Sequence, residues 1–398
     1  MIDIKDKRQC CGCAACYSIC PKKCISMNAD DEGFLYPKVS LSECINCGLC
    51  EKVCPVIHQI KEDSNKPLAY ACWHKDSAVI ASSSSGGVFS ALAEAVVASG
   101  GLVCGASFDR NWNVEHRFVD NIEQIYLLRG SKYVQSNVGE ALKQVKKYLG
   151  ERRPVMFVGT PCQIAGLNHY IGNKCDTLLT VEVICHSIPS PKVWADYLSY
   201  LISKTVPQGL KSRIHSVSFR SKLNGWNNYS LRVMGDIVDS QNEVVEANKV
   251  FICQGKNENL YMRGFLSDLY NRPSCTNCPA RCHKSDCDIT IGDFWRIEKY
   301  HPELADSKGI SIMLLYSDRA IKWLNQIEDR INMFPVPYEE VEPYGVHTPL
   351  TRSSKDHPLR HFFFSLPKNI PINTRIYLCV RPVEILTGVK SFVKRVIK

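Results

Sequence analysis

The sequence lacks any long hydrophobic run. Its longest apolar segments, such as Thr180 to Ile184, are far shorter than the roughly 20 apolar residues that a membrane-spanning helix needs. The first ten residues, MIDIKDKRQC, also lack the apolar core of a secretory signal. Both absences predict a cytoplasmic protein.

The sequence also lacks a strongly charged segment. Lys and Arg number 49 against 40 Asp and Glu, a net charge of +9. Residues 1–66 carry nine of each, so the excess is spread over the remainder. Because basic residues interleaved with aromatic ones do not form a patch before the C-terminus, we expect no nucleic-acid partner. The 45% hydrophobic content excludes a disordered chain, and 398 residues suggest two or three domains.

Cysteine is abundant, with 21 residues. In a long chain without a predicted signal, so many cysteines indicate metal or redox chemistry rather than a disulfide framework. Their odd number also excludes complete disulfide pairing within the chain.

Residues 10–55 repeat one pattern, C-x2-C-x2-C-x3-C-P, first at Cys10 to Pro21 and again at Cys44 to Pro55. This is the bacterial ferredoxin spacing, in which the fourth cysteine of each run ligates the other cluster. The repeat predicts two 4Fe-4S clusters in a ferredoxin-like domain of residues 1–62. The first would be held by Cys10, Cys13, Cys16 and Cys54, and the second by Cys44, Cys47, Cys50 and Cys20.

Zinc is the alternative for these cysteines. A zinc site needs one tetrahedral quartet and would not require two matched runs that each end in Cys-Pro. A two-cluster domain carries single electrons, so at the front of a longer chain it predicts a second redox site. The polar segment Lys61 to Pro67 is the predicted linker.

The central region contains a Ser/Gly-rich turn between a predicted strand, 68–73, and a predicted helix, 88–99. Free amides and the helix dipole make such a turn a candidate anion site, for example for a cofactor phosphate. An ordinary capped helix is the alternative. Further apolar strands at 102–108, 154–158 and 177–184 alternate with helices, which predicts an α/β domain with a parallel sheet.

Four cysteines further along are candidate metal ligands. Cys162 and Cys185 follow two predicted strands, at the edge where α/β sheets bind ligands. Cys275 and Cys278 form half of a metal site. From the spacing alone, their partners are either these two distant cysteines or the local pair Cys282 and Cys287, which would suit zinc.

Six motifs spread over about 210 residues resemble, in order, those of the coenzyme F420 hydrogenase/dehydrogenase beta-subunit family, in its form with a fused ferredoxin domain. They are Ser84 to Gly87, Gly130 to Tyr133, Gly159 to Gln163, Cys185 to Pro191, Pro273 to Cys278 and Ser285 to Trp295. The resemblance implies an FAD-binding α/β domain over residues 68–345 with a third 4Fe-4S cluster. The implied cluster ligands are Cys162, Cys185, Cys275 and Cys278, and the implied FAD contacts are Ser84, Ser85, Gly86, Gly87, Ser131, Lys132 and Tyr133.

A flavin accepts a two-electron hydride, whereas each cluster accepts one electron, so the cofactors together split electron pairs. We therefore expect an oxidoreductase that moves electrons between a hydride carrier such as coenzyme F420, FAD and a redox partner protein or small-molecule carrier. One alternative is an electron relay without catalysis. Another is a reductase that serves bacterial surface-polysaccharide biosynthesis without coenzyme F420. His186 is interpreted as a structural residue.

The carboxyl-terminal tail, residues 346–398, is predicted to be helical. Its last eleven residues, GVKSFVKRVIK, combine an apolar helical face with four positive charges and no acid. This pattern is typical of helices that lie on a membrane surface. A terminal helix packed on its own domain is the alternative. The predicted fold class is therefore α+β in the ferredoxin-like domain and α/β in the flavin-binding domain, followed by this helical tail.

Overall fold

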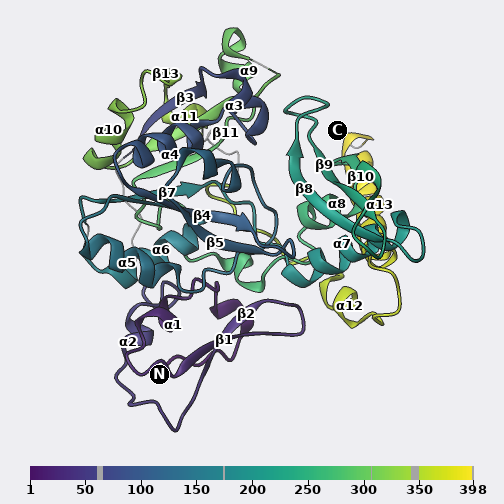
Figure 1. Cartoon of the computed structure of the whole chain (residues 1–398), viewed down its shortest axis with the longest axis horizontal. Coiled ribbons are helices and arrows are strands. Elements are labelled where there is room, and N and C mark those ends of the chain that lie inside the picture. Colours follow the sequence, from purple (N-terminus) through teal and green to yellow (C-terminus); the bar gives the residue numbers. More distant parts are fainter. Residues whose placement is uncertain (61–65, 174, 306, 342–348, 397–398) are drawn as a thin grey trace.

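The computed structural model describes residues 1–60, 66–173, 175–305, 307–341 and 349–396, with side chains up to residue 387. It has three parts: an amino-terminal domain, a central sheet covered by helices, and a second lobe built on a smaller sheet (Figure 1). Most of the predicted linker at Lys61 to Pro67 lies outside the described residues, and so does the predicted boundary at residue 345.

The amino-terminal domain pairs strands β1 and β2 antiparallel and adds three short helical turns. Helix α2 begins directly after Gly48, whose φ of 74° is easily adopted only by glycine. The elements of this domain are η1 (Lys7–Gln9), α1 (Ala15–Ile19), β1 (Ile25–Ala29), β2 (Leu35–Val39) and α2 (Leu49–Lys52).

The central sheet has eight strands in the order β13-β3-β12-β11-β7-β6-β4-β5. The four strands β11, β7, β6 and β4 are parallel, and three of them, β4, β6 and β7, are the strands from which a parallel sheet was predicted. The pairs on both sides of these four are antiparallel, including those of β3, which was also predicted as a strand. Five residues join β4 to β5, too few for the crossover that parallel strands require. The strands are β3 (Leu68–His74), β4 (Leu102–Phe108), β5 (Val114–Val119), β6 (Val155–Gly159), β7 (Leu178–Val183), β11 (Ile289–Asp293), β12 (Ser311–Leu315) and β13 (Ile331–Val336).

Helices cover both faces of this sheet. Every residue of β6 is buried, as expected for a strand with helices on both sides. Met156 packs in the cluster formed with α4 and α10, whereas Phe157 packs in the cluster formed with α5 and α6. The helical elements of this part are α3 (Ser77–Ser82), α4 (Val88–Ala98), η2 (Ile122–Leu127), α5 (Ala141–Gly150), α6 (Pro161–Ile171), α9 (Ile297–Tyr300), η4 (Pro302–Leu304), α10 (Asp318–Asn325) and α11 (Tyr338–Val341).

The second lobe was not predicted. Its antiparallel sheet, in the order β10-β9-β8, packs with α7, α8 and α13 around one aromatic core (Figure 1). The tail contributes Phe363, Ile372 and Ile376 to this core. The elements are α7 (Pro191–Thr205), β8 (Lys211–Ser221), β9 (Ser230–Val238), β10 (Val244–Gly255), α8 (Leu260–Leu266), η3 (Pro273–Asn277), α12 (Arg360–Ser365) and α13 (Ile372–Val396).

The predicted basic segment at 388–398 continues α13 as far as Val396, but its side chains lie outside the described residues. The helices in the described ranges include none with the length and apolar character needed to cross a bilayer.

Candidate functional site: a cavity beside clustered cysteines

The two predicted amino-terminal cysteine quartets each come together in the structure. Burial raises the pKa of Cys16 to about 12, and the neighbouring thiols of Cys10 and Cys54 contribute to the same shift. The electrostatic influence of Cys16 and Cys54 also reaches Cys13. The other quartet lines one small cavity, formed by Cys20, Cys44, Cys47 and Cys50 together with Cys24. In both quartets the fourth cysteine of one repeat joins the first three of the other.

The four cysteines implied by the family resemblance also lie close together. Cys162 is in the first turn of α6, Cys185 follows β7, and Cys275 and Cys278 belong to η3 and its C-cap. Burial raises the pKa of Cys275 to about 12, with further contributions from the thiols of Cys278 and Cys162. Burial likewise raises the pKa of Cys185, on which the thiols of the other three act.

The chemistry of this quartet suits an iron–sulfur cluster. The four thiols come from three separate segments, and two of them, Cys162 and Cys275, are buried while Cys185 and Cys278 are partly buried. The buried guanidinium of Arg281 favours the thiolate form of Cys185. The local pair that was the alternative to Cys162 and Cys185 makes other contacts. Cys287 Sγ lies 3.4 Å from Thr290 Oγ1, and Cys282 Sγ lies 3.8 Å from the carbonyl oxygen of Thr351. In the described part of the chain, no three His, Cys, Asp or Glu side chains converge on one metal-ion position.

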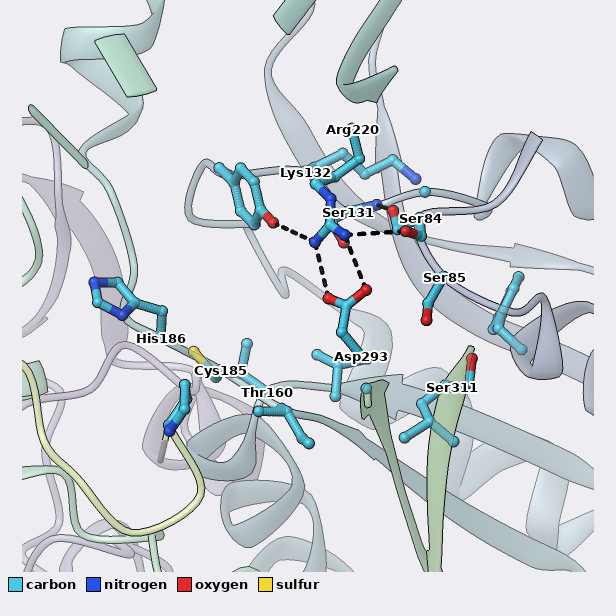
Figure 2. A pocket seen from close by; sticks show the side chains of 18 of the residues that line it. Ser84, Ser85, Ser131, Lys132, Thr160, Cys185, His186, Arg220, Asp293 and Ser311 are labelled. Atoms are coloured by element: carbon cyan, nitrogen blue, oxygen red, sulfur yellow. Dashed lines mark hydrogen bonds and ion pairs between the residues drawn. The ribbon is translucent and has the colours of Figure 1, made fainter. Parts of the chain in front are cut away.

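A cavity of about 560 Å³ lies beside this quartet, between the central sheet and the second lobe. Thr160 and Cys185, at the ends of the parallel strands β6 and β7, form part of its wall (Figure 2). This is the edge at which α/β sheets bind ligands, as predicted. Six of the seven predicted FAD contacts line the cavity: Ser84, Ser85, Gly87, Ser131, Lys132 and Tyr133.

Gly86, the seventh, lies behind the cavity wall and fixes the Ser84–Gly87 loop. Its N–H donates to Ser311 Oγ at 2.9 Å, and a Cβ atom at this position would lie 2.6 Å from the carbonyl oxygen of Cys72. The two predicted segments meet directly, because the N–H of Ser131 donates to Ser84 Oγ at 2.7 Å. The loop is therefore held in one conformation by contacts on both sides.

Gly86→Ala is expected to destabilise the protein by about 1–3 kcal/mol, because the new methyl group has to displace backbone atoms in a packed core. Urea unfolding would measure the loss. Gly150→Ala is the matched control, since a Cβ there meets no atom within 4 Å. Equal stability of the two variants would contradict the close approach at Gly86.

An ion pair that the sequence did not reveal crosses the cavity wall. Arg220 of β8 forms two hydrogen bonds with Asp293 of β11, at 2.8 and 2.9 Å (Figure 2). Its guanidinium also donates to Tyr133 Oη at 3.2 Å and to the carbonyl oxygen of Ser84 at 3.1 Å. Although burial opposes its charge, Tyr133 and Asp293 hold the pKa of Arg220 above its ordinary value. This residue therefore joins the second lobe to both predicted FAD-contact segments.

Lys132 is a partly buried cation on the same wall. Its ammonium group donates to the carbonyl oxygens of Leu127 and Arg129, at 3.2 and 3.0 Å. Burial lowers the pKa of Lys132 to about 7. Across the described ranges, no carboxylate forms an ion pair with it. A partly buried ammonium group that faces a cavity and has carbonyl partners suits an anionic ligand.

His186, which also lines the cavity, makes structural contacts. Its Nε2 lies 3.3 Å from Asp268 Oδ1, and its ring packs edge-on against Phe265. The close approach of His186 helps to hold the pKa of Asp268 below its usual value despite burial. These contacts agree with the structural interpretation of His186.

Comparison with known proteins identifies the family. The chain matches the beta subunit of coenzyme F420 hydrogenase/dehydrogenase in two regions, the N-terminal part at residues 69–143 and the C-terminal part at 152–338, which together make up about two thirds of its length. It matches a 4Fe-4S dicluster domain at residues 9–57. The chain therefore belongs to the coenzyme F420 hydrogenase/dehydrogenase beta-subunit family and carries a 4Fe-4S dicluster domain at its amino-terminal end.

Two individual relatives agree with this assignment. The chain is 30% identical to a component of the F(420)H(2) dehydrogenase of Methanosarcina mazei over 166 residues, which is 39% of this chain and 46% of that one. It is 34% identical to an uncharacterized ferredoxin of Methanocaldococcus jannaschii over 70 residues, 16% of this chain and 90% of that one. The match spans about half the length of the dehydrogenase component. A solved structure of the xenon-derivatised F420-reducing [NiFe] hydrogenase complex from Methanosarcina barkeri aligns with a TM-score of 0.44 at 17% identity, over 71% of this chain and 87% of that one.

The family and domain matches confirm the predicted family and the predicted 4Fe-4S dicluster domain. FAD, coenzyme F420, the third cluster and the individual ligands stay predictions.

Proposed function

We propose that this protein is a flavo-iron–sulfur oxidoreductase. It passes electrons between a hydride carrier, coenzyme F420 or a similar molecule, FAD in the 560 Å³ cavity and an acceptor, through three 4Fe-4S clusters. One observation carries the proposal: Cys185 lines the cavity and is also a member of the third cysteine quartet. A flavin in this cavity would therefore border on a cluster, as electron transfer between them requires.

The residues of the cavity wall suit the parts of FAD. The Ser84–Gly87 loop precedes α4, an 11-residue helix, so backbone N–H groups and the helix dipole would attract the phosphates. Lys132 would supply the opposite charge. When bound, the flavin would take up a hydride and release its two electrons singly. Arg220 and Asp293 would hold the two lobes in place around it.

The remaining predictions belong to the same proposal. The electron partner is a redox protein or a small carrier. No nucleic acid takes part. The protein is cytoplasmic, and its basic C-terminal helix gives it a peripheral contact with the membrane surface. The domain limits at 1–62, 68–345 and 346–398 are proposed as the sequence predicts them.

The test uses protein purified and reconstituted without oxygen. Iron, zinc and flavin are quantified, and reduced coenzyme F420 is then added while its absorbance and that of the flavin are followed. We expect about twelve iron atoms, from three four-iron clusters, and one FAD per chain, with bleaching of the flavin as the coenzyme is oxidised.

The other outcomes separate the alternatives. The same cofactors without a reaction would exclude coenzyme F420 and favour the surface-polysaccharide reductase. Clusters without flavin would favour the electron relay. Zinc in place of the third cluster would contradict the proposal.

A further inference from the structure

The amino-terminal domain is not merely tethered to the central domain but shares a core with it. Cys11, Cys13 and Ala15 belong to the same apolar cluster as residues of α5 and α6. On α6, a Cβ atom in place of Gly166 would lie 2.7 Å from both Cβ and Sγ of Cys13. The absence of a side chain at this glycine allows a cluster-binding loop to lie directly on the helix.

Polar contacts fix the same interface at separate points. Arg360 forms two hydrogen bonds with Glu32, at 2.8 and 2.5 Å. Gln135 Nε2 donates to the carbonyl oxygen of Cys11 at 3.3 Å, and Tyr17 donates to Glu140. Because these contacts and the packing on α6 involve several different segments of the large domain, the orientation of the amino-terminal domain is fixed.

Arg272 lies at the centre of this interface and is 1% exposed. Its guanidinium donates to the carbonyl oxygens of Cys10 at 2.7 Å and Leu35 at 2.8 Å, and to Gln135 Oε1 at 2.7 Å. Nη2 lies 3.6 Å from Cys10 Sγ, and the guanidinium packs over the ring of Tyr36 at 4.4 Å. Although burial opposes the charge, Cys10, Tyr36, Cys11 and Cys275 raise the pKa of Arg272.

Arg272 is also near the third quartet. It is the N-cap of η3, the turn that contains Cys275, and its charge acts on the thiols of Cys162 and Cys275. Cys162 and Gly166 lie four residues apart on α6, so Cys13, which packs against Gly166, lies next to the helical turn that carries Cys162. Cys11 packs in the same apolar cluster as Cys162. The first amino-terminal quartet therefore adjoins the third quartet at α6.

The second amino-terminal quartet faces the other way. Cys47 is exposed, and its neighbours Leu41 and Ile45 are 71% and 57% exposed. The residues that line its cavity all belong to the amino-terminal domain. It thus adjoins solvent rather than the central domain.

From this arrangement we propose a fixed order of the clusters. The cluster of Cys10, Cys13, Cys16 and Cys54 is the inner one, next to the third cluster, and the cluster of Cys20, Cys44, Cys47 and Cys50 is the outer one. Arg272 is the positioning residue of the inner cluster. Each step transfers one electron, which oxidises one cluster and reduces the next. The order rests on the proposed function, because it requires a third cluster.

The order is tested by removing each amino-terminal cluster separately and recording electron paramagnetic resonance spectra of the fully reduced, reconstituted protein. Cys16→Ala removes the inner cluster and Cys47→Ala the outer one. We expect the magnetic interaction of the third cluster with its neighbour to disappear in the first variant and to persist in the second.

The opposite pattern would overturn the order while leaving the proposed function intact. An iron content of about eight atoms in the unsubstituted protein, the sum for two four-iron clusters, would instead overturn the proposed function and the order with it. Each variant replaces one cluster ligand and leaves every other residue of the interface between the two domains unchanged, so the two variants can be compared directly.

The role of Arg272 is tested through reduction potentials. A guanidinium directed at a ligand sulfur stabilises the added electron, which raises the potential of that cluster. In Arg272→Met we expect the potential of the inner cluster to fall while that of the outer cluster stays unchanged, in a titration followed by electron paramagnetic resonance. Arg272→Lys, which retains the charge, should restore most of the inner potential.

Arg263→Met is the control, since Arg263 pairs with Glu384 in the second lobe. Equal shifts of both clusters, or none, would overturn the assignment. If Arg272→Met does not fold, Arg272→Lys still tests it by hydrogen exchange. Lysine cannot make the four contacts of the guanidinium, so amides of residues 10–14 should exchange faster than in the control. Unchanged exchange would contradict the positioning role.

Discussion

Cys278→Ala is expected to lower the iron content from about twelve to about eight atoms per chain, because one of three four-iron clusters loses a ligand. Electron transfer between the flavin and the amino-terminal clusters should then be lost, while the spectra of those two clusters remain. Cys278 is only partly buried, at the C-cap of η3, so its truncation leaves the packed core intact. Iron analysis and single-turnover absorbance would measure both effects.

Cys282→Ala and Cys287→Ala provide the matched comparison. Both cysteines follow Cys278 within nine residues, but their sulfurs lie against Thr351 and Thr290 instead of the quartet. We expect both variants to retain all three clusters. Loss of four irons from either of them would show that the local pair, and not Cys162 and Cys185, completes the site that Cys275 and Cys278 begin.

Lys132→Met is expected to weaken FAD binding by about ten- to a hundredfold, the equivalent of one charge-assisted hydrogen bond of about 1.5–3 kcal/mol. The methionine side chain fills a similar volume without the charge. Fluorescence titration of flavin-free protein would measure the dissociation constant. Lys146→Met on the outer face of α5 is the control, and equal affinity of the two variants would contradict a phosphate partner for Lys132.

The same lysine predicts a pH dependence of FAD affinity. With a pKa of about 7, Lys132 is charged below pH 7 in the flavin-free protein and neutral above it. A phosphate favours the charged form and raises this pKa, so binding takes up a proton above pH 7. Affinity should therefore be highest below pH 7 and fall by up to about tenfold per pH unit above it.

The pH dependence should be absent in Lys132→Met. His116, the titratable neighbour whose pKa is lowered mainly by burial and also by Lys132, has a pKa of about 4 and does not change its charge in this range. Titrations at several values from pH 6 to pH 9 would make the comparison. A slope that persists in the variant would assign the effect to another group.

The sequence was most informative where a function depends on closely spaced residues. Within each of the two cysteine runs, successive cysteines lie no more than four positions apart, so their spacing alone indicates which thiols meet. The Ser84–Gly87 turn was recognisable as a Ser/Gly-rich segment before a predicted helix, and α4 begins directly after Gly87.

The missed residues depend on contacts between distant segments. Arg220 and Asp293 are 73 positions apart, and Arg272 is 262 positions from Cys10. Each of the three is a single charged residue outside the cysteine repeat, so its burial becomes evident only in the folded chain. The sheet β8–β10 was missed because two of its three strands, β8 and β10, are largely exposed and carry no continuous apolar run. The antiparallel pairing of β4 with β5 was also missed, because it depends on the short connection between the two strands and not on their composition.

Because Cys11 and Cys13 share a core with α5 and α6, the stability of the whole polypeptide depends on insertion of the inner cluster. A chain synthesised when iron is scarce, or one whose inner cluster has been destroyed by oxygen, would expose an apolar surface that proteases and chaperones recognise. Damage at the cluster would thus shorten the lifetime of the entire protein. For the same reason, the amino-terminal module cannot be exchanged for another ferredoxin as an independent part, since its replacement must reproduce the face that packs on α6.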